Sequence, residues 1–420
     1  MAGAVNATDV PEPGSVRVRL GGHVNFYAAA ILSDTGNAAP GYKQAKYTFG
    51  DYVHLNPSVD GVAANGLRYG TFVDIWNEKP VVPGGGTGGG ISAVDRTAGT
   101  LYVRRAWVYI GAASAGTIRV GSGDSPAGLF QTGTFENFND GGWNGDVPGL
   151  LSGNATPIWP FALVGNLYTP TKVTYLSPQL YGFEFGVSYE PNTSQFTTFD
   201  GSCGTASTGC ARLSASNQAA DLARRTNMVN PEIRYRGTFG AVGIAAEAGY
   251  MGSGHVHPDA SGPGSTITPT TANYRGFNMG IGGIAVTYGG LTVGGHVQAG
   301  SFNSQWGLAP VGAPDAFAWV AGASYAVGPV IVGASFFQYN FAGNSYTSLA
   351  PVYRGVGQER DRGIAAGGTY TVVPGLSVFL SYLWGDRKEN GYDLLNNVAG
   401  SSANNTTKAQ LVSIGTQLRW

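Results

Sequence analysis

The stretch Leu376-Ser-Val-Phe-Leu-Ser-Tyr-Leu-Trp384 indicates how this chain is built, because its apolar side chains recur with a period of two. Successive side chains of an extended strand point to opposite faces, so one face of this segment is apolar. That face carries Leu376, Val378, Leu380, Tyr382 and Trp384. A segment of about ten residues is also the length with which a tilted β-strand crosses a bilayer.

The same alternation recurs along the chain. In the segment 291–299, one face carries Leu291, Val293, Val297 and Ala299, and the opposite face carries Thr292, His296 and Gln298. In the segment 16–27, one face carries Val16, Val18, Leu20, Val24 and Phe26, and the other carries Arg17, Arg19, His23, Asn25 and Tyr27. Such alternation predicts strands with one apolar face and one polar face.

The composition argues against an ordinary soluble protein and against a bundle of membrane helices. Charged residues make up only 12% of the 420 residues, which is about half the usual share and too few to cover a soluble surface. The mean hydropathy of -0.03 is close to zero, and no run approaches the roughly eighteen apolar residues of a spanning helix. Apolar and polar residues must therefore be finely interleaved, as in a wall between lipid and water.

The sequence contains no pattern from which a catalytic residue can be nominated. The net charge of -1 gives no reason to expect a nucleic-acid partner. Neither a G-x-S-x-G elbow nor an H-E-x-x-H helix occurs. The glycine-rich run Pro83–Gly90 lacks the lysine of a P-loop and a following helix, so it is interpreted as a loop tip. We expect no enzyme activity, no cofactor and no resident metal, and leave open a calcium ion bound by the loops.

Two short clusters could bind a metal or form a cross-link. His255 and His257 lie close to Asp259, but two imidazoles in a loop rarely make a tight metal site. Cys203 and Cys210 lie seven positions apart in a Gly/Ser/Thr-rich segment without further cysteines, which makes them a poor zinc site. In an oxidising compartment they would close a small loop, and we predict a disulfide.

The segment Met1–Ser15 has neither the basic region nor the apolar region of a signal peptide. If the protein is exported, we expect its signal peptide to be absent from this sequence and Met1 to be an added start residue.

Short and long connections alternate between the predicted strands. The short ones are Ala112–Gly116, Ser177–Gly182, Gly237–Gly240, Tyr288–Gly290, Ala326–Pro329 and Val373–Gly375. The long ones are 33–41, 77–99, 122–169, 191–227, 252–274, 302–314, 342–361 and 386–407. The turn near 56–66 is longer than its class. This rhythm is typical of membrane barrels with short periplasmic turns and longer extracellular loops.

Counting the strands between these connections gives about sixteen, an even number as in single-chain bacterial barrels. The predicted spans are 16–32, 42–55, 67–77, 100–111, 117–121, 170–177, 182–190, 228–236, 241–251, 275–288, 291–301, 316–326, 329–341, 362–372, 376–385 and 408–420. A barrel of this width encloses a water-filled lumen rather than a packed core. No linker or change of composition interrupts the pattern, so residues 1–420 are predicted to form one domain.

The chain ends with an alternating segment, 411–420, whose last residue is Trp420. One face of this segment carries Val412, Ile414, Leu418 and Trp420. Pairing of this strand with the first one would close the barrel and remove its exposed edges. A terminal aromatic residue would then lie in the interfacial girdle of the barrel.

Strand order and loop lengths over nearly the whole chain resemble those of the sixteen-stranded general porins of Gram-negative bacteria, especially of alphaproteobacteria. The resemblance is most specific in the segments 104–111 and 116–121, which are similar to the family's fourth and fifth strands, and in Trp420, which resembles its assembly signal. It implies an outer-membrane channel for passive diffusion of ions and small hydrophilic solutes. It also implies a homotrimer, contact with outer-membrane lipid and lipopolysaccharide, recognition by the barrel-assembly machinery, and a third loop folded into the lumen.

The third long connection, 122–169, is the candidate constriction loop. It is rich in large apolar side chains, so it is expected to pack against a wall rather than extend into solvent. The alternative is a long loop that caps the barrel or contacts a partner. Its acidic residues are Asp124, Glu136, Asp140 and Asp146. Glu136 best matches the acidic tip of the family's loop.

The resemblance places a ladder of basic residues on the wall opposite this loop. The candidates are Arg17, Arg19, Lys46, Arg68, Arg104, Arg105 and Arg119. Alternation places Arg17, Arg19 and Lys46 inward, whereas the inward phase of Arg104 or Arg105 stays open because both phases of their strand contain aromatics. Basic and acidic groups across a narrow gap would create a transverse field that orients solutes. The alternative for any single arginine is a charge that the wet lumen simply tolerates.

Two other functions compete with passive diffusion. A sugar-selective channel would need a stacked aromatic track, and the inward aromatics Phe72, Trp76 and Phe379 do not form an obvious row in the sequence. A soluble β-sandwich or adhesin is disfavoured by the low charge and the sustained alternation. The preference for anions or cations cannot be predicted, since the basic wall would favour anions and the acidic loop would favour cations.

Overall fold

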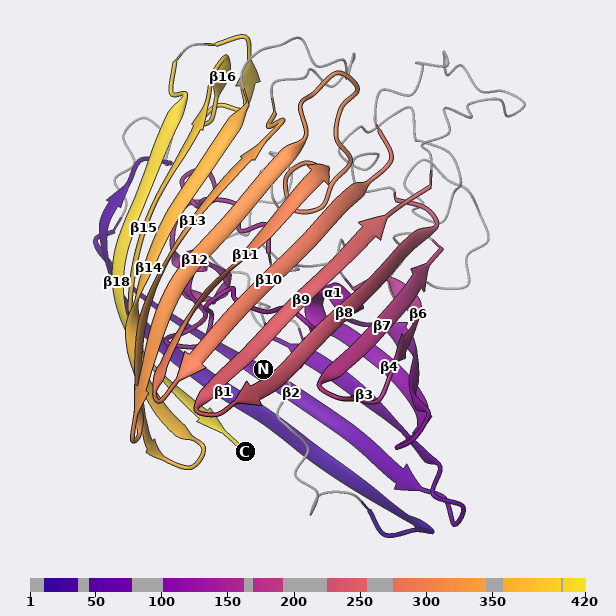
Figure 1. Cartoon of the computed structure of the whole chain (residues 1–420). Coiled ribbons are helices and arrows are strands. Elements are labelled where there is room, and N and C mark those ends of the chain that lie inside the picture. Colours follow the sequence, from indigo (N-terminus) through magenta and orange to yellow (C-terminus); the bar gives the residue numbers. More distant parts are fainter. Residues whose placement is uncertain are drawn as a thin grey trace.

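The chain forms a closed antiparallel barrel of sixteen strands, as predicted (Figure 1). The computed structural model describes residues 11–36, 45–77, 101–161, 169–191, 225–254, 275–344, 358–401 and 403–420. Neighbouring barrel strands follow one another in the sequence, and β1 (Ser15–Asp34) pairs with β18 (Thr406–Arg419) to close the circle. Closure leaves no barrel strand with an unpaired edge.

The remaining barrel strands are β2 (Tyr47–Val62), β3 (Arg68–Trp76), β4 (Tyr102–Ala112), β5 (Gly116–Ser122), β6 (Thr171–Leu176), β7 (Phe183–Glu190), β8 (Met228–Phe239), β9 (Val242–Gly252), β10 (Asn278–Tyr288), β11 (Leu291–Ser301), β12 (Ala316–Val327), β13 (Val330–Phe341), β14 (Glu359–Val373) and β15 (Leu376–Glu389). A separate two-stranded sheet joins β16 (Tyr392–Asp393) and β17 (Val398–Ala399). The only helical segments of the described residues are α1 (Pro126–Leu129), η2 (Gly142–Asn144) and η3 (Val147–Leu150). None of these is long or apolar enough to span a membrane.

The predicted alternation sorts side chains between the two faces of the wall. On β1, Val18 is 75% exposed and Leu20 is 65% exposed, whereas Asn25 and Tyr27 are buried inside. On β11, Val297 is exposed on the outside and His296 is buried on the inside. An outer surface made of large apolar side chains is what a lipid environment requires.

Short turns join the strands at one end of the barrel, here called the turn end, and long connections join them at the other, the loop end. The predicted turn near 56–66 is mostly strand, because β2 continues to Val62 and pairs with β1 as far as Ser15. Pro57 is tolerated there because the pairing of β2 with β3 is interrupted beside it, between Leu55 and Ser58.

The barrel closes with Trp420 beside the first strand. The backbone N–H of Trp420 donates to the carbonyl of Gly22 at 3.1 Å, and the N–H of Gly22 donates back at 3.3 Å. A Cβ on Gly22 would lie 2.7 Å from the Trp420 ring and 2.6 Å from the carbonyl oxygen of His54. Glycine at this position therefore allows the terminal aromatic ring to lie against β1.

Candidate functional site

The described part of the connection between β5 and β6 lies inside the barrel, as expected for the segment 122–169. The helix α1 contacts β7, β8 and β9, while η2 contacts β14 and β15, and η3 contacts β1 and β2. Most of its large side chains are buried, namely those of Phe130, Phe135, Phe138, Trp143, Leu151, Trp159 and Phe161. The described part of this connection, 123–161, thus crosses the interior and packs against the wall; it is called the inner loop below.

Glycines on the wall make room for the aromatic side chains of the inner loop. A Cβ on Gly322 of β12 would lie 2.8 Å from the ring of Phe135, and one on Gly333 of β13 would lie 2.5 Å from the ring of Phe138. A Cβ on Gly363 of β14 would collide with the ring of Trp143. Three neighbouring strands therefore each accept one aromatic ring. Burying a ring of this size stabilises the packed loop by about 2–3 kcal/mol.

Polar side chains of the wall anchor the start of the inner loop. Glu247 of β9 accepts a hydrogen bond from the backbone N–H of Thr132 at 2.9 Å. Nδ1 of His296 lies 3.1 Å from the Thr132 carbonyl and 2.8 Å from Oε1 of Glu247. Asn230 of β8 accepts from the N–H of Ala127 at 2.8 Å. Glu247 and Asn230 were not predicted from the sequence, although buried polar residues at inward positions of neighbouring strands are a signal of an internal partner.

Asp140 and Asp146 fasten the middle of the inner loop to β1. The hydroxyl oxygen of Tyr27 lies 2.7 Å from Oδ1 of Asp140 and 3.1 Å from Oδ2 of Asp146. Oδ2 of Asp140 also accepts the backbone N–H groups of Asp146 and Val147. Burial raises the pKa of Asp140 to about 6. These two predicted pore acids therefore contact a tyrosine of the wall and the backbone of the loop itself.

Glu136 contacts its own loop. It accepts a hydrogen bond from Nδ2 of Asn144 at 2.6 Å, and desolvation by burial raises the pKa of Glu136. In the sequence, this predicted acidic tip lies between Phe135 and Phe138, whose rings are buried against glycines of the wall.

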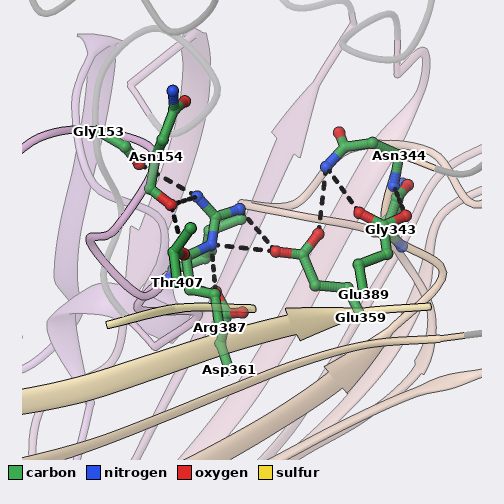
Figure 2. Close-up of polar contacts among 11 residues, drawn as sticks. Gly153, Asn154, Gly343, Asn344, Glu359, Asp361, Arg387, Glu389 and Thr407 are labelled. Atoms are coloured by element: carbon green, nitrogen blue, oxygen red, sulfur yellow. Dashed lines mark hydrogen bonds and ion pairs between the residues drawn. The ribbon is translucent and has the colours of Figure 1, made fainter. Parts of the chain in front are cut away.

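The end of the inner loop is held by an arginine of β15. Figure 2 shows Arg387 between the loop carbonyls of Gly153 and Asn154 on one side and the carboxylate of Glu359 on the other. The distance from Nη2 of Arg387 to Oε1 of Glu359 is 2.6 Å. This contact was not predictable from the sequence, because residues far apart in the chain form it.

Two further carboxylates adjoin this arginine. Asp361 accepts the backbone N–H of Ile158 at 2.6 Å and lies 3.3 Å from Nε of Arg387. Glu389 lies opposite Glu359 in the β14–β15 register, and Asn344 bridges their carboxylates with contacts of 3.2 Å each (Figure 2). The buried cluster thus combines three carboxyl groups with one guanidinium group.

A β-bulge in β4 brings both Arg104 and Arg105, whose inward phase the alternation left open, into the interior. The register between β3 and β4 shifts between Asp74 and Ile75. As a result, both Arg104 and Arg105 reach Oδ2 of Asp74, at 3.8 Å and 3.6 Å. A bulge places two consecutive residues opposite one, so strict alternation does not hold there. Arg105 also contacts Asp124 at the start of the inner loop, with 2.8 Å between Nε and Oδ1.

A second group of arginines lies at the turn end. Asp60 of β2 lies 3.8 Å from Arg19 and opposite Arg17 in the β1–β2 register. The hydroxyl of Tyr109 donates to Asp60, and the charges of Arg68 and Arg119 act on Tyr109. The predicted basic wall therefore divides into this turn-end group, consisting of Arg17, Arg19, Arg68 and Arg119, and the pair at the bulge.

Lys46 does not join either group. It precedes β2 at the loop end and is exposed, whereas Arg17 and Arg19 lie near the start of β1 at the turn end. Alternation assigns a side chain to a face of a strand but gives no information on its height in the barrel. The predicted disulfide of Cys203 and Cys210 and the His255–Asp259 cluster lie outside the described residues.

The sequence matches a profile for Gram-negative porins over residues 1–409. The chain belongs to the Gram-negative porin family. This porin is an outer-membrane channel through which solutes diffuse passively. The fold agrees with the sequence prediction and with the resemblance on which part of it was based. No curated protein matches the sequence.

Solved structures share the fold of this porin at low sequence identity. The outer-membrane channel DcaP of Acinetobacter baumannii is 12% identical, with a TM-score of 0.53, over 97% of this chain and 99% of that one. An anion-selective porin from Comamonas acidovorans is 13% identical, with a TM-score of 0.52, over 97% of this chain and 100% of that one. The trimer form of OmpT of Vibrio cholerae is 13% identical, with a TM-score of 0.52, over 97% and 100%.

Proposed function

We propose that solutes cross this porin between the inner loop and the arginine-bearing wall formed by β3–β5 and the turn-end part of β1. The position of the inner loop carries this proposal, since its aromatic side chains pack against β12, β13 and β14 and its end is held by β15. The wall on the opposite side carries Arg104 and Arg105 at the bulge and the turn-end arginines below them. Charged groups along such a passage determine which ions enter it.

We propose a preference for anions. The acids of the inner loop are engaged: Asp124 with Arg105, Glu136 with Asn144, and Asp140 with Tyr27. In the described part of the chain, the turn-end group brings four arginines together with Asp60, and the charge of Asp124 also acts on Arg119. An excess of cationic groups along a narrow passage raises the local concentration of anions.

The reversal potential of single channels in a potassium chloride gradient tests this preference. Arg68→Ala removes one lumen charge, and we expect the reversal potential to shift toward that of a cation-selective channel. Lys408→Ala is the matched control, because Lys408 is exposed on the outer face of β18. A cation-selective wild-type channel, or equal potentials for wild type and Arg68→Ala, would contradict the proposal.

A sugar-selective channel remains the alternative, and one observation bears on it. Tyr52, His54 and Trp76 form a row of neighbouring rings: His54 stacks on Trp76 with centroids 3.9 Å apart, and Tyr52 is tilted against His54 at 4.5 Å. The other face of Trp76 is covered by Arg104, whose guanidinium lies 3.9 Å from the ring centroid. Because both faces of Trp76 are occupied, the row offers no open stacking platform there. Block of the conductance by a sugar would nevertheless favour this alternative.

We infer that the porin assembles as a homotrimer without an enzyme activity of its own, and that it contacts outer-membrane lipid and the barrel-assembly machinery. The trimeric assembly is supported by the shared fold with the OmpT trimer of Vibrio cholerae. Closure of reconstituted channels in three equal steps would agree with this proposal, and single-step closure would contradict it.

A further inference from the structure

A row of inward side chains, each directly opposite the next, crosses five neighbouring strands near the turn end. It consists of Arg17 of β1, Asp60 of β2, Gly70 of β3, Tyr109 of β4 and Arg119 of β5. An arginine therefore stands at each end of the row, and an aromatic side chain lies between them on the wall of the lumen.

The ring of Tyr109 lies against the backbone of the neighbouring strand. A Cβ on Gly70 would lie 2.7 Å from Cε1 and 2.9 Å from Cζ of this ring. The hydroxyl reaches one strand further and donates to Asp60. Glycine within a strand often marks such a close approach. The ring thus extends along the wall from β4 across β3, so that one face is covered by the wall and the other faces the lumen.

The lumen-facing side of the Tyr109 ring is open to a solute. Tyr109 is half-buried, and no ring–ring or cation–ring contact with another described residue involves it. Other inward rings of this wall are already covered. Both faces of Trp76 are occupied, and Trp107 stacks on Phe72 at 4.4 Å and lies 5.5 Å from the guanidinium of Arg119. Tyr109 therefore offers a stacking surface that Trp76 and Trp107 do not.

Arg68 adds a guanidinium group on the turn-end side of this ring. It lies two positions before Gly70 on β3, so both residues belong to the inward face, and its charge acts on Tyr109. The side chain of Arg68 is exposed, and no hydrogen bond or ion pair joins it to another described residue. Arg19, by contrast, lies 3.8 Å from Asp60. Within the described wall, Arg68 can therefore bind an anion without losing another contact.

We propose that Tyr109 and Arg68 form a binding site for small aromatic carboxylates within the passage. This inference rests on the proposed function, because it takes the anion-selective passage along β3–β5 as the route. The ring of such a solute stacks in an offset arrangement on Tyr109. Its carboxylate accepts a forked pair of hydrogen bonds from the guanidinium of Arg68. Chloride uses only the positive charge and a neutral sugar only the ring, so an aromatic carboxylate is held more strongly than either.

Block of the single-channel chloride current by added benzoate tests this inference. Cyclohexanecarboxylate is the comparison probe, because it carries the same charge and the same number of carbon atoms but has no aromatic ring. We expect the half-blocking concentration of benzoate to be roughly two- to tenfold lower, as the usual contribution of an aromatic pair beyond its buried area implies.

Variants of the two residues separate the ring from the charge. Tyr109→Leu removes the ring and should bring the two half-blocking concentrations together, whereas Tyr109→Phe keeps the ring and should retain the difference. Tyr69→Leu is the matched control, since Tyr69 lies over Gly61 in a similar way but on the outer face of β3. Arg68→Ala should raise the half-blocking concentration of both acids, and it provides a second test if Tyr109→Leu lacks the heat-modifiable mobility of a folded barrel.

Equal block of the wild type by the two acids would overturn the inference but leave the anion preference in place, because the reversal potential measures that preference separately. A difference that persists in Tyr109→Leu would also overturn it, since another ring would then be responsible. Unchanged block of Arg68→Ala would do the same for the proposed carboxylate contact. A cation-selective wild-type channel would instead contradict the proposed function and, with it, this inference.

Discussion

At the scale of single residues, the acidic side chains of the inner loop hold the loop in place as well as carrying charge into the lumen. Asp140 shows this most clearly, because one carboxylate holds the hydroxyl of Tyr27 and two backbone N–H groups. The residue type and the loop were predictable from sequence. The partner was not, because Tyr27 lies 113 positions away and is brought near only when the loop folds back into the barrel.

We predict that the attachment of the inner loop at Asp140 weakens as the pH rises through about 6, since burial raises the pKa of this carboxyl above its unfolded value. Its protonated form is favoured in the folded loop, so the contribution to stability is complete at low pH and is lost as the group ionises. Hydrogen exchange of the Asp146 and Val147 amides, corrected for intrinsic rates, measures this attachment. In Asp140→Asn, protection should no longer differ between pH 4.5 and 7.5; a persisting difference would assign the effect to another group.

At the scale of elements, strands and loop fit each other through the glycines of the wall. Alternation predicted strands β12–β14. A period of two does not, however, distinguish a glycine that contacts no side chain from a glycine that leaves room for an aromatic ring. The β4 bulge is a second case, because one extra residue changes which side chains face inward. Both features depend on contacts between segments distant in sequence.

Gly333→Ala is predicted to displace Phe138, because the new Cβ would lie 2.5 Å from its ring and 2.8 Å from the carbonyl oxygen of Ala323. Overpacking of this kind costs about 1–3 kcal/mol of unfolding free energy. Gly282→Ala on β10 is the matched control, because its nearest atom would lie at 3.6 Å. Urea unfolding of the two variants in micelles measures the difference, and equal midpoints would argue against a tight fit at Gly333.

At the scale of the whole molecule, closure of the barrel depends on the pairing of the first and last strands. The sequence prediction that these strands meet is confirmed by the β1–β18 register. Trp420 contributes backbone bonds to Gly22 and a ring that is half exposed on the outside. Its role as an assembly signal stays a prediction.

Trp420→Ala is predicted to lower the yield of folded barrel in cells, measured as heat-modifiable mobility in electrophoresis. Trp384→Ala, an outward tryptophan within β15, serves as the control. Refolding of the purified variant into micelles separates the two possible causes. Normal refolding with poor assembly in cells would show that the Trp420 ring is recognised by the assembly machinery. Poor refolding would show that the ring is needed for closure of the barrel itself. Normal yields in both settings would refute the prediction.

The sequence by itself determined the number of strands and the face of most strand side chains, because the two-residue period and the turn signals are local, and its strand order and loop lengths pointed to the family. It also located the loop that folds inward, through the apolar residues that a solvated loop would not carry. Only the tertiary structure decided the height of each charge in the barrel, the inward turn of both Arg104 and Arg105, and the partners of Asp140 and Arg387. These depend on register, a bulge and contacts across the lumen, which arise only when distant strands close around the loop.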